Sequence, residues 1–124
     1  MITFYHNPRC TTSREALDML KKRGEEIKVI KYLVDPPTYE EMKEILRKLN
    51  LRPMYLLRKE EDLYKKNFKG KYFTDDQWTR ILIDNPILIQ RPVVVRGEKA
   101  VVARPPKRIN ELFETDKKRD EESD

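Results

Sequence analysis

The hydrophobic pattern of the first 33 residues predicts a strand, a helix and a second strand. Residues 2–5 form a short β-prone run. From Thr11 onward, apolar residues recur at helical spacing, and Gly24 is a stop signal for that helix. Apolar and charged residues then alternate less regularly over residues 27–33, which favours a second strand. This order is typical of a βαβ unit with a parallel strand pair.

The middle of the chain predicts helices only. Thr38 with Glu41, and Thr74 with Gln77, each match the capping box that begins a helix. Apolar residues follow both boxes at helical spacing, and two shorter helical pieces are expected between them. We therefore expect an all-helical insert over about residues 38–89.

The last part of the chain predicts a hairpin and a final helix. Residues 92–95 and 100–103 are β-prone, and the four residues between them resemble a turn. Residues 107–113 carry apolar side chains at helical spacing. The full order is βαβ, helical insert, ββα. It predicts an α/β protein with a thioredoxin-like fold, built as a single domain over residues 1–113.

The charge distribution separates a basic body from an acidic tail. The net charge is +5, but residues 114–124 hold three basic and six acidic residues and are expected to be disordered. The remaining body has 24 basic and 16 acidic residues, interspersed rather than in blocks, which is typical of a solvated surface. No apolar run is long enough to span a bilayer or to act as a secretory signal, so we expect a cytoplasmic protein with no membrane partner.

The sequence contains one cysteine, Cys10, and one histidine, His6. A single cysteine forms no disulfide within the chain, and this pair of residues cannot provide a four-ligand zinc site. We therefore expect no bound metal and no disulfide scaffold. A lone cysteine in a reducing compartment is either a small buried hydrophobic residue or a reactive thiol.

The neighbours of Cys10 favour a reactive, exposed thiolate. Cys10 lies where a strand gives way to a helix, and the free amides at a helix start attract an anion. Thr11 and Thr12 add hydroxyl groups there, and Arg9 and Arg14 add positive charge. The same amides can hold an oxyanion against the sulfur. None of these neighbours provides an apolar pocket for a structural cysteine.

Ser13 stands where a C-x-x-C motif would place its second sulfur. Because no internal thiol can resolve an adduct on Cys10, an outside thiol must do so. Ser13 either donates a hydrogen bond to the thiolate or caps the first helical turn. His6 either assists the thiol or packs its ring in the turn.

Three arginines stand at the ends of predicted elements: Arg58, Arg91 and Arg104. Arg91 and Arg104 each precede a proline, in stiff backbone. From spacing alone, each of the three is a solvated charge. Arg96, in the predicted hairpin turn, has the same charge and is expected to have no role in a site.

An ordered set of motifs resembles the glutaredoxin-coupled arsenate reductases, from about Ile2 to Phe113. The wider family includes Spx regulators of RNA polymerase and arsenate-reductase-like proteins. The motifs that carry the resemblance are Tyr5-His6-Asn7-Pro8-Arg9-Cys10, Ser13-Arg14, Tyr32-Leu33, Pro36-Pro37, Leu56-Leu57-Arg58-Lys59, Phe73-Thr74-Asp75-Asp76-Gln77, Asn85-Pro86-Ile87-Leu88-Ile89, Arg91-Pro92-Val93-Val94-Val95 and Arg104-Pro105.

The resemblance implies an oxidoreductase of arsenic detoxification that reduces arsenate to arsenite. The nucleophile of the family matches Cys10, and its oxyanion-binding arginines match Arg58, Arg91 and Arg104. Glutathione is implied as a co-substrate and glutaredoxin as a protein partner, with no bound cofactor and no nucleic acid.

The same resemblance implies three supporting roles. The histidine and serine that assist the cysteine match His6 and Ser13, and the proline that is cis in thioredoxin-like folds matches Pro92. Two alternatives stay open. One is a Spx-like redox sensor that binds RNA polymerase, although such sensors usually carry a second cysteine where Ser13 stands. The other is a related oxidoreductase with a different substrate.

Overall fold

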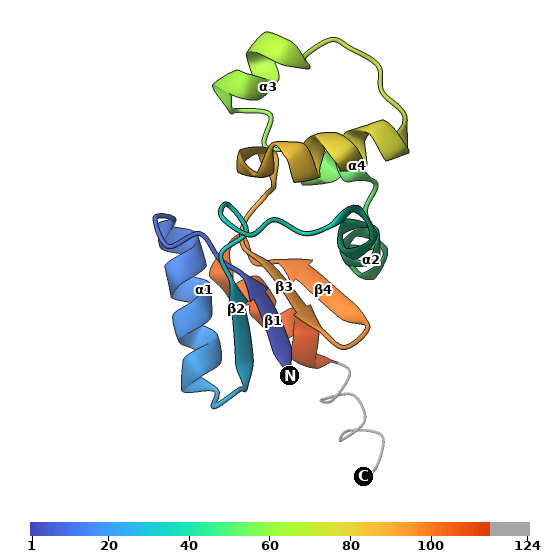
Figure 1. Ribbon diagram of the computed structural model, residues 1–124. Coiled ribbons are helices and arrows are strands. Elements are labelled where there is room, and N and C mark those ends of the chain that lie inside the picture. Colours follow the sequence, from blue (N-terminus) through green and yellow to red (C-terminus); the bar gives the residue numbers. More distant parts are fainter. Residues whose placement is uncertain (115–124) are drawn as a thin grey trace. The chain divides into compact units, whose positions relative to one another are not determined.

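The computed structural model describes residues 1–114, which divide into two compact units (Figure 1). The first, here called the sheet unit, consists of residues 1–30 and the described residues from Arg91 onward. The second, the helical unit, consists of residues 31–90. The tail expected to be disordered lies, from residue 115 onward, outside the described residues. The two ends of the chain therefore build one sheet, and the middle builds a separate helical body.

The sheet unit contains a mixed four-stranded sheet in the order β2-β1-β3-β4. The central strand β1 runs parallel to β2 and antiparallel to β3, and β4 pairs antiparallel with β3. This topology confirms the expected βαβ unit and hairpin. The strands are β1 (Ile2–Tyr5), β2 (Ile27–Ile30), β3 (Val93–Arg96) and β4 (Lys99–Val102).

The second strand is shorter than the sequence indicated. It ends at Ile30 instead of residue 33, because the chain turns at Lys31, whose carbonyl accepts hydrogen bonds from the amides of Val34 and Asp35 at 3.0 and 2.9 Å. Leu33, an apolar residue of the predicted strand, is 42% exposed. An apolar side chain that remains in solvent adds to the strand-like pattern of the sequence without forming a strand.

Two helices complete the sheet unit. Helix α1 (Thr11–Lys22) is followed by Gly24, whose φ of 76° is the left-handed conformation that favours glycine. The last element, η3 (Pro106–Phe113), is a 3-10 helix. Helices α1 and η3 contact each other, and η3 also contacts β3 and β4. The core between them consists of Ile2, Phe4, Ala16, Leu17, Leu20, Val94, Val101, Ala103, Ile109, Leu112 and Phe113.

The two main helices of the helical unit begin with the expected capping boxes. The Thr38 and Thr74 side chains accept hydrogen bonds from the backbone amides of Glu41 and Gln77. The side chains of Glu41 and Gln77 in turn accept from the backbone amides of the two threonines. The helices of this unit are α2 (Tyr39–Leu49), η1 (Pro53–Leu56), α3 (Asp62–Asn67), α4 (Asp75–Asp84) and η2 (Pro86–Leu88).

Helix α4 is the centre of the helical unit, because it contacts α2, η1 and η2. Its Trp78 is 4% exposed and meets the ring of Phe73 edge-on, with centroids 4.8 Å apart. Phe68 lies near both rings. Such aromatic pairs contribute about 0.5–1.5 kcal/mol beyond the area they bury. The loop that follows α3 is therefore held on α4 by aromatic contacts.

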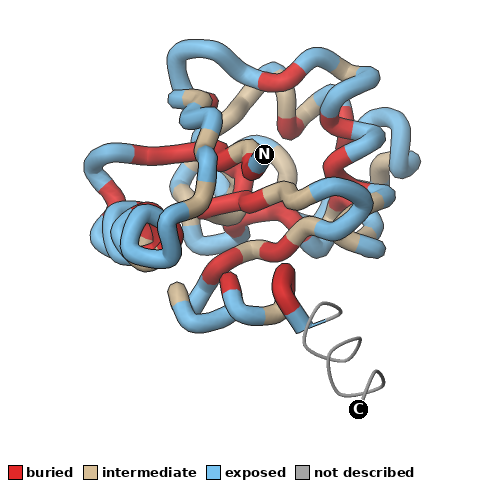
Figure 2. The backbone as a smooth tube through the Cα atoms, turned by 90° about the horizontal axis from the view of Figure 1, so that it is seen from below, coloured by how far each residue is buried: buried red, intermediate tan, exposed pale blue. Residues whose placement is uncertain are grey.

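Buried and exposed stretches alternate along the chain (Figure 2), and the buried residues include most of β1 but none of the edge strand β2. Helices α1, α2 and α4 each bury one face and leave the rest to solvent, as amphipathic helices do, whereas α3 has no buried residue. Within the described residues, none of the helices combines the length and the apolar character that a membrane crossing needs.

Candidate active site

Cys10 forms the junction between the β1–α1 loop and helix α1. It is the N-cap residue, with extended φ and ψ of −97° and 121°, and its amide donates to the Asn7 carbonyl at 3.0 Å. No side chain caps α1, and its first turn contains no acidic residue. The first amides of a helix have no intrahelical acceptor, so the positive end of α1 begins next to the sulfur.

The sulfur is more enclosed than the sequence indicated. Cys10 is 9% exposed, whereas its polar neighbours led us to expect an exposed thiolate. The difference arises because the loop folds inward. His6 and Asn7 are buried at 8% and 6% exposure, and Ser13 is fully buried. A short polar segment thus encloses its cysteine without providing an apolar pocket.

Arg104 is the cation placed against the sulfur. Its Nη1 lies 3.9 Å from Cys10 Sγ and donates to the Arg91 carbonyl at 3.4 Å. In the part of the chain that the structure describes, no carboxylate pairs with Arg104. Its positive charge is therefore available to a thiolate or to an anion bound there.

His6 and Ser13 form a buried pair behind the cysteine loop. Ser13 Oγ lies 2.7 Å from His6 Nδ1 and accepts from the Asn7 amide at 3.1 Å. The His6 ring also meets Phe4 edge-on, with centroids 5.5 Å apart. Ser13 thus ties the loop to the first turn of α1. Within residues 1–114, its hydroxyl makes neither of the two contacts considered for it, a hydrogen bond to the Cys10 sulfur or a cap on that turn.

Thr11 and Thr12 open helix α1, as expected. Thr11 is exposed, and its hydroxyl accepts from Arg14 Nη2 at 3.2 Å. Arg14 Nη1 also donates to the Pro8 carbonyl at 2.9 Å. Arg14 therefore fastens the loop to the helix, while the Arg9 side chain is exposed.

Arg91 and Arg104 both precede cis peptide bonds, Arg91–Pro92 and Arg104–Pro105. A cis bond was expected only at Pro92, from the family resemblance. Arg91 Nε is buried and has no hydrogen-bond partner among residues 1–114. Arg96, by contrast, is not a free charge in a turn. It ends β3, donates from Nη1 to the Leu112 carbonyl at 3.1 Å, and lies 4.5 Å from the Phe113 ring centroid.

Arg58 belongs to the helical unit and is paired with acids. The residue is 9% exposed, its Nη1 lies 2.5 Å from Glu61, and its Nε lies 3.2 Å from Glu60. This pairing was not predicted, although the run Arg58-Lys59-Glu60-Glu61 places two acids close to the arginine in sequence. The structure thus describes Arg58 as a buried, charge-compensated arginine.

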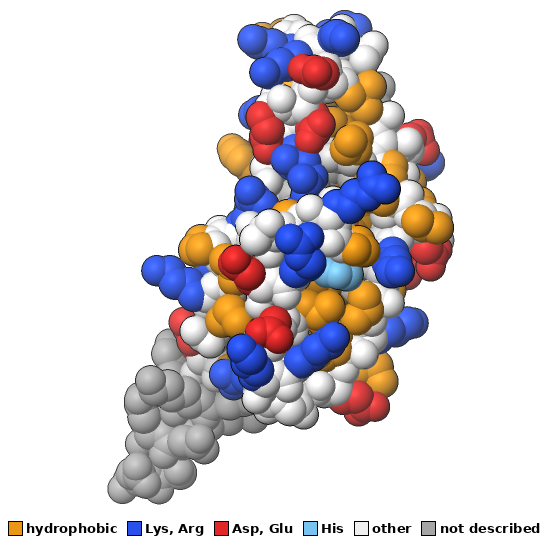
Figure 3. Space-filling view, turned by 90° about the vertical axis from the view of Figure 1, so that its left-hand side faces the viewer, with side chains coloured by type: hydrophobic (Ala, Val, Ile, Leu, Met, Phe, Trp, Pro, Cys, Tyr) orange, Lys and Arg blue, Asp and Glu red, His pale blue; other side chains and the backbone are white. Residues whose placement is uncertain are grey.

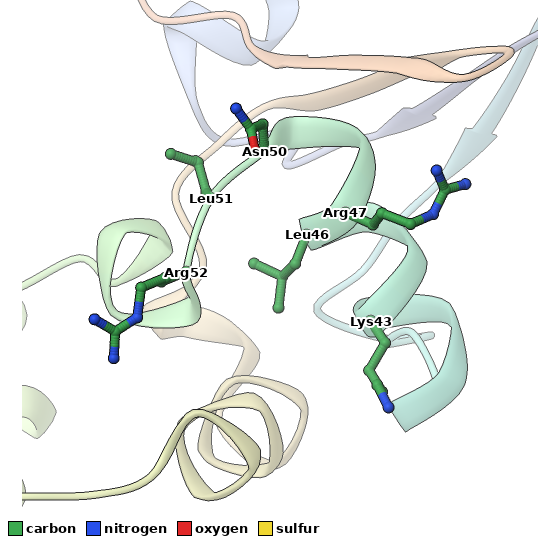
Figure 4. Close-up of a pocket in the computed structure, with 6 residues that line it drawn as sticks. All are labelled: Lys43, Leu46, Arg47, Asn50, Leu51 and Arg52. Carbon is green, nitrogen blue, oxygen red and sulfur yellow. The ribbon is translucent and has the colours of Figure 1, made fainter.

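Other features of the surface add no candidate for the chemistry. A cavity of about 360 Å³ in the helical unit is lined by none of the predicted site residues (Figure 4). Basic side chains are spread over the face in Figure 3 and do not form one block. Among the described residues, no three His, Cys, Asp or Glu side chains gather as metal ligands would. The residues lining the cavity are Lys43, Leu46, Arg47, Asn50, Leu51 and Arg52.

Comparison with known proteins places this geometry in a family. An arsenate reductase of Neisseria meningitidis is 40% identical over 90% of this chain and 97% of its own, and the uncharacterized protein YfgD of Escherichia coli is 37% identical over 90% and 95%. A solved structure described as a putative arsenate reductase from Yersinia pestis has a TM-score of 0.85 at 42% identity, covering 90% of this chain and 99% of its own. An arsenate reductase from Vibrio cholerae also scores 0.85, at 37% identity over 90% and 96%.

These matches confirm the predicted mixed α/β, thioredoxin-like fold. The family model described as the ArsC family matches residues 5–112, which include the cysteine loop, the helical unit, Arg91-Pro92 and Arg104-Pro105. The chain belongs to the ArsC family.

Proposed function

We propose that the protein is an arsenate reductase in which Cys10 is the nucleophile and glutathione and glutaredoxin supply the electrons. The observation that carries the proposal is the sulfur at the positive end of α1 with Arg104 Nη1 3.9 Å away, in a chain 40% identical to a relative named arsenate reductase. A thiolate and an oxyanion both need positive charge at one place, and this arrangement provides it.

In the first step, the Cys10 thiolate attacks the arsenic atom of arsenate. A sulfur–arsenic bond forms, one arsenic–oxygen bond breaks, and the departing oxygen leaves as water after taking up protons. Arsenic remains As(V) in this adduct. Arg104, Arg91 and the first amides of α1, at Thr11 and Thr12, offset the charge of the oxyanion and of the departing oxygen.

In the second step, the thiolate of glutathione attacks the Cys10 sulfur. The electron pair of the sulfur–arsenic bond passes to arsenic, which leaves as arsenite, As(III), and a Cys10–glutathione disulfide remains. A glutaredoxin thiol then attacks the glutathione sulfur and releases the Cys10 thiolate. Cys10 is the only cysteine of the chain, so both electrons must come from outside thiols.

The remaining predicted residues take supporting roles in this proposal. Arg58 supplies an oxyanion contact, as the family resemblance implies. His6 and Ser13 hold the cysteine loop through their 2.7 Å contact and keep the sulfur at the helix start. Since glutathione and glutaredoxin work in a reducing compartment, the cytoplasm is the proposed location.

The proposal is tested by following NADPH consumption with arsenate, glutathione, glutathione reductase and glutaredoxin, each omitted in turn. We expect turnover only in the complete mixture, and arsenite as the product. Turnover that persists without glutaredoxin would reject that partner. Absence of turnover with arsenate in the complete mixture would reject the substrate.

A further inference from the structure

Arg14 contacts three of the residues that form the junction at the cysteine, all of them in the sheet unit. Its backbone amide donates to the Cys10 carbonyl at 3.0 Å. Its side chain points back toward the start of α1, where Nη1 donates to the Pro8 carbonyl at 2.9 Å and Nη2 donates to the Thr11 hydroxyl at 3.2 Å. Arg14 therefore holds the chain on both sides of the sulfur.

The side chain of Arg14 closes the loop from outside, whereas Asn7 holds it from inside. The buried Asn7 accepts from the Cys10 amide through its carbonyl and from the Arg9 amide through Oδ1, each at 3.0 Å. Arg14 is exposed, as are Pro8 and Arg9 at the tip of the loop. Within residues 1–114, Arg14 is the donor found for the Pro8 carbonyl. Removal of its side chain therefore frees the tip and leaves the buried contacts of Asn7 in place.

A cation at this position opposes the charge preference of a helix start. The free amides of the first turn are positive, so acids are favoured there. Helices α2 and α4 follow this preference with two acids each. Helix α1 has none and places the Arg14 guanidinium against its own first turn. A sequence that breaks a local preference in this way is expected at functional positions.

We propose that Arg14 is a positioning residue, which holds the cysteine loop so that the Cys10 sulfur keeps a fixed place at the start of α1. This inference rests on the proposed function, in which Cys10 is the nucleophile. A nucleophile displaced by about 1 Å loses about a hundredfold in rate, and a loop that is loosened rather than displaced should lose less. The alternative is that Arg14 acts through its charge alone and attracts the anion.

Substitutions of Arg14 separate positioning from charge. Arg14→Met removes the charge and the donors. Arg14→Lys keeps the charge, but an ammonium does not reproduce the planar fork that spans the Pro8 carbonyl and the Thr11 hydroxyl. If positioning dominates, both variants lower kcat for arsenate about tenfold, with KM within about twofold. If charge dominates, Arg14→Met raises KM and Arg14→Lys restores wild-type kinetics, and that result overturns the proposal.

Arg9 is the matched control for charge. It adjoins Cys10, has the same charge as Arg14 and is also exposed. Within residues 1–114, its side chain has no hydrogen bond or ion pair. Arg9→Met therefore removes a charge from the loop without removing a contact. We expect Arg14→Met to lower kcat at least fivefold more than Arg9→Met does, and equal losses in the two variants would overturn the proposal.

Hydrogen exchange of the Cys10 amide measures the loop without turnover. This amide donates to the Asn7 carbonyl, and opening of the loop exposes it to water. We expect Arg14→Met and Arg14→Lys to speed its exchange about tenfold relative to the wild type and to Arg9→Met. The amides of Leu17 and Leu20, within α1, are the internal reference. Equal acceleration at these two amides would show general unfolding and would overturn the proposal.

The two measurements distinguish failure of this inference from failure of the proposed function. If the Cys10 amide exchanges faster in Arg14→Met but the wild type does not reduce arsenate in the complete mixture, the proposed function fails and the role of Arg14 in placing Cys10 stands. If the wild type reduces arsenate while Arg14→Met changes neither exchange nor kcat, the function stands and the role of Arg14 fails.

Discussion

Helix α1 of the sheet unit begins differently from α2 and α4, the two main helices of the helical unit. In the helical unit, α2 and α4 begin with complete capping boxes and with acidic residues in the first turn. In the sheet unit, α1 begins at Cys10 with no side-chain cap and no acid in its first turn. Caps stabilise a helix by satisfying its first amides, so α1 lacks a stabilisation that α2 and α4 have. This difference is expected where the free amides have a ligand to bind.

The arginines of the two units show the same difference. Arg104 faces the sulfur without a carboxylate partner in the described chain, whereas Arg58 is compensated by Glu60 and Glu61. An arginine without a carboxylate partner attracts an anion from solution through its charge. An arginine that is paired with carboxylates acts mainly through hydrogen-bond donors held in a fixed orientation. The sheet unit should therefore provide most of the anion binding, and the four predictions below test this from the largest effect to the smallest.

The largest effect is expected from Cys10→Ser. A hydroxyl is a far weaker nucleophile than a thiolate, so arsenate reduction should fall below detection while the fold persists. Circular dichroism and the unfolding midpoint check the fold, and the coupled NADPH assay checks turnover. Residual arsenate reduction by a folded Cys10→Ser protein would rule out the covalent mechanism.

The second largest effect is expected from Arg104→Ala. Loss of one donor at a developing oxyanion costs about a hundredfold or more in rate, roughly 3 kcal/mol. The matched control is Lys107→Ala, because Lys107 is exposed, has the same charge and has no ion pair within residues 1–114. Arg96 is unsuitable, since its contacts with Leu112 and Phe113 support the core. Equal, mild losses in both variants would show that Arg104 supplies only general charge.

A third substitution should change stability and activity in opposite directions. Thr12→Asp places an acid in the first turn of α1, where the helix dipole favours it by about 0.3–1 kcal/mol. The same carboxylate repels an oxyanion at that helix start. We therefore expect kcat/KM to fall about tenfold, which corresponds to roughly 1.4 kcal/mol. Thermal unfolding and arsenate kinetics measure the two effects. A variant that gains stability without losing kcat/KM would place the anion elsewhere.

Local patterns gave the fold almost completely. The Thr38 and Thr74 boxes, the Gly24 stop and the hairpin depend on neighbours in sequence, and the structure confirms each of them. The errors arose where tertiary structure decides. Residues 31–33 entered a turn instead of extending β2, whereas the expected final helix is present as a 3-10 helix.

The site was predictable in its residue types and less so in its contacts. Cys10, Arg91-Pro92 and Arg104-Pro105 were visible as motifs. The enclosure of the sulfur was not, because it depends on how residues 6 and 7 fold inward against Ser13. The pairing of Ser13 with His6 spans seven residues and depends on the strand–helix geometry. The neutralisation of Arg58 by Glu61 follows from sequence spacing only once the turn at that position is known.

The smallest effect is expected in the helical unit, from Thr38→Ala. The Thr38 side chain accepts from the Glu41 amide at 3.2 Å, and its loss leaves the start of α2 with an unsatisfied donor. Such a change costs about 1 kcal/mol of stability. Thr38→Ser keeps the acceptor and should restore most of that loss. Because α2 has no part in the proposed chemistry, kcat/KM for arsenate should stay within about twofold of wild type at a temperature where the variant is folded. If Thr38→Ala lowered kcat/KM as much as Thr12→Asp, the capped and the uncapped helix starts would not differ in function, and the division between the two units would fail.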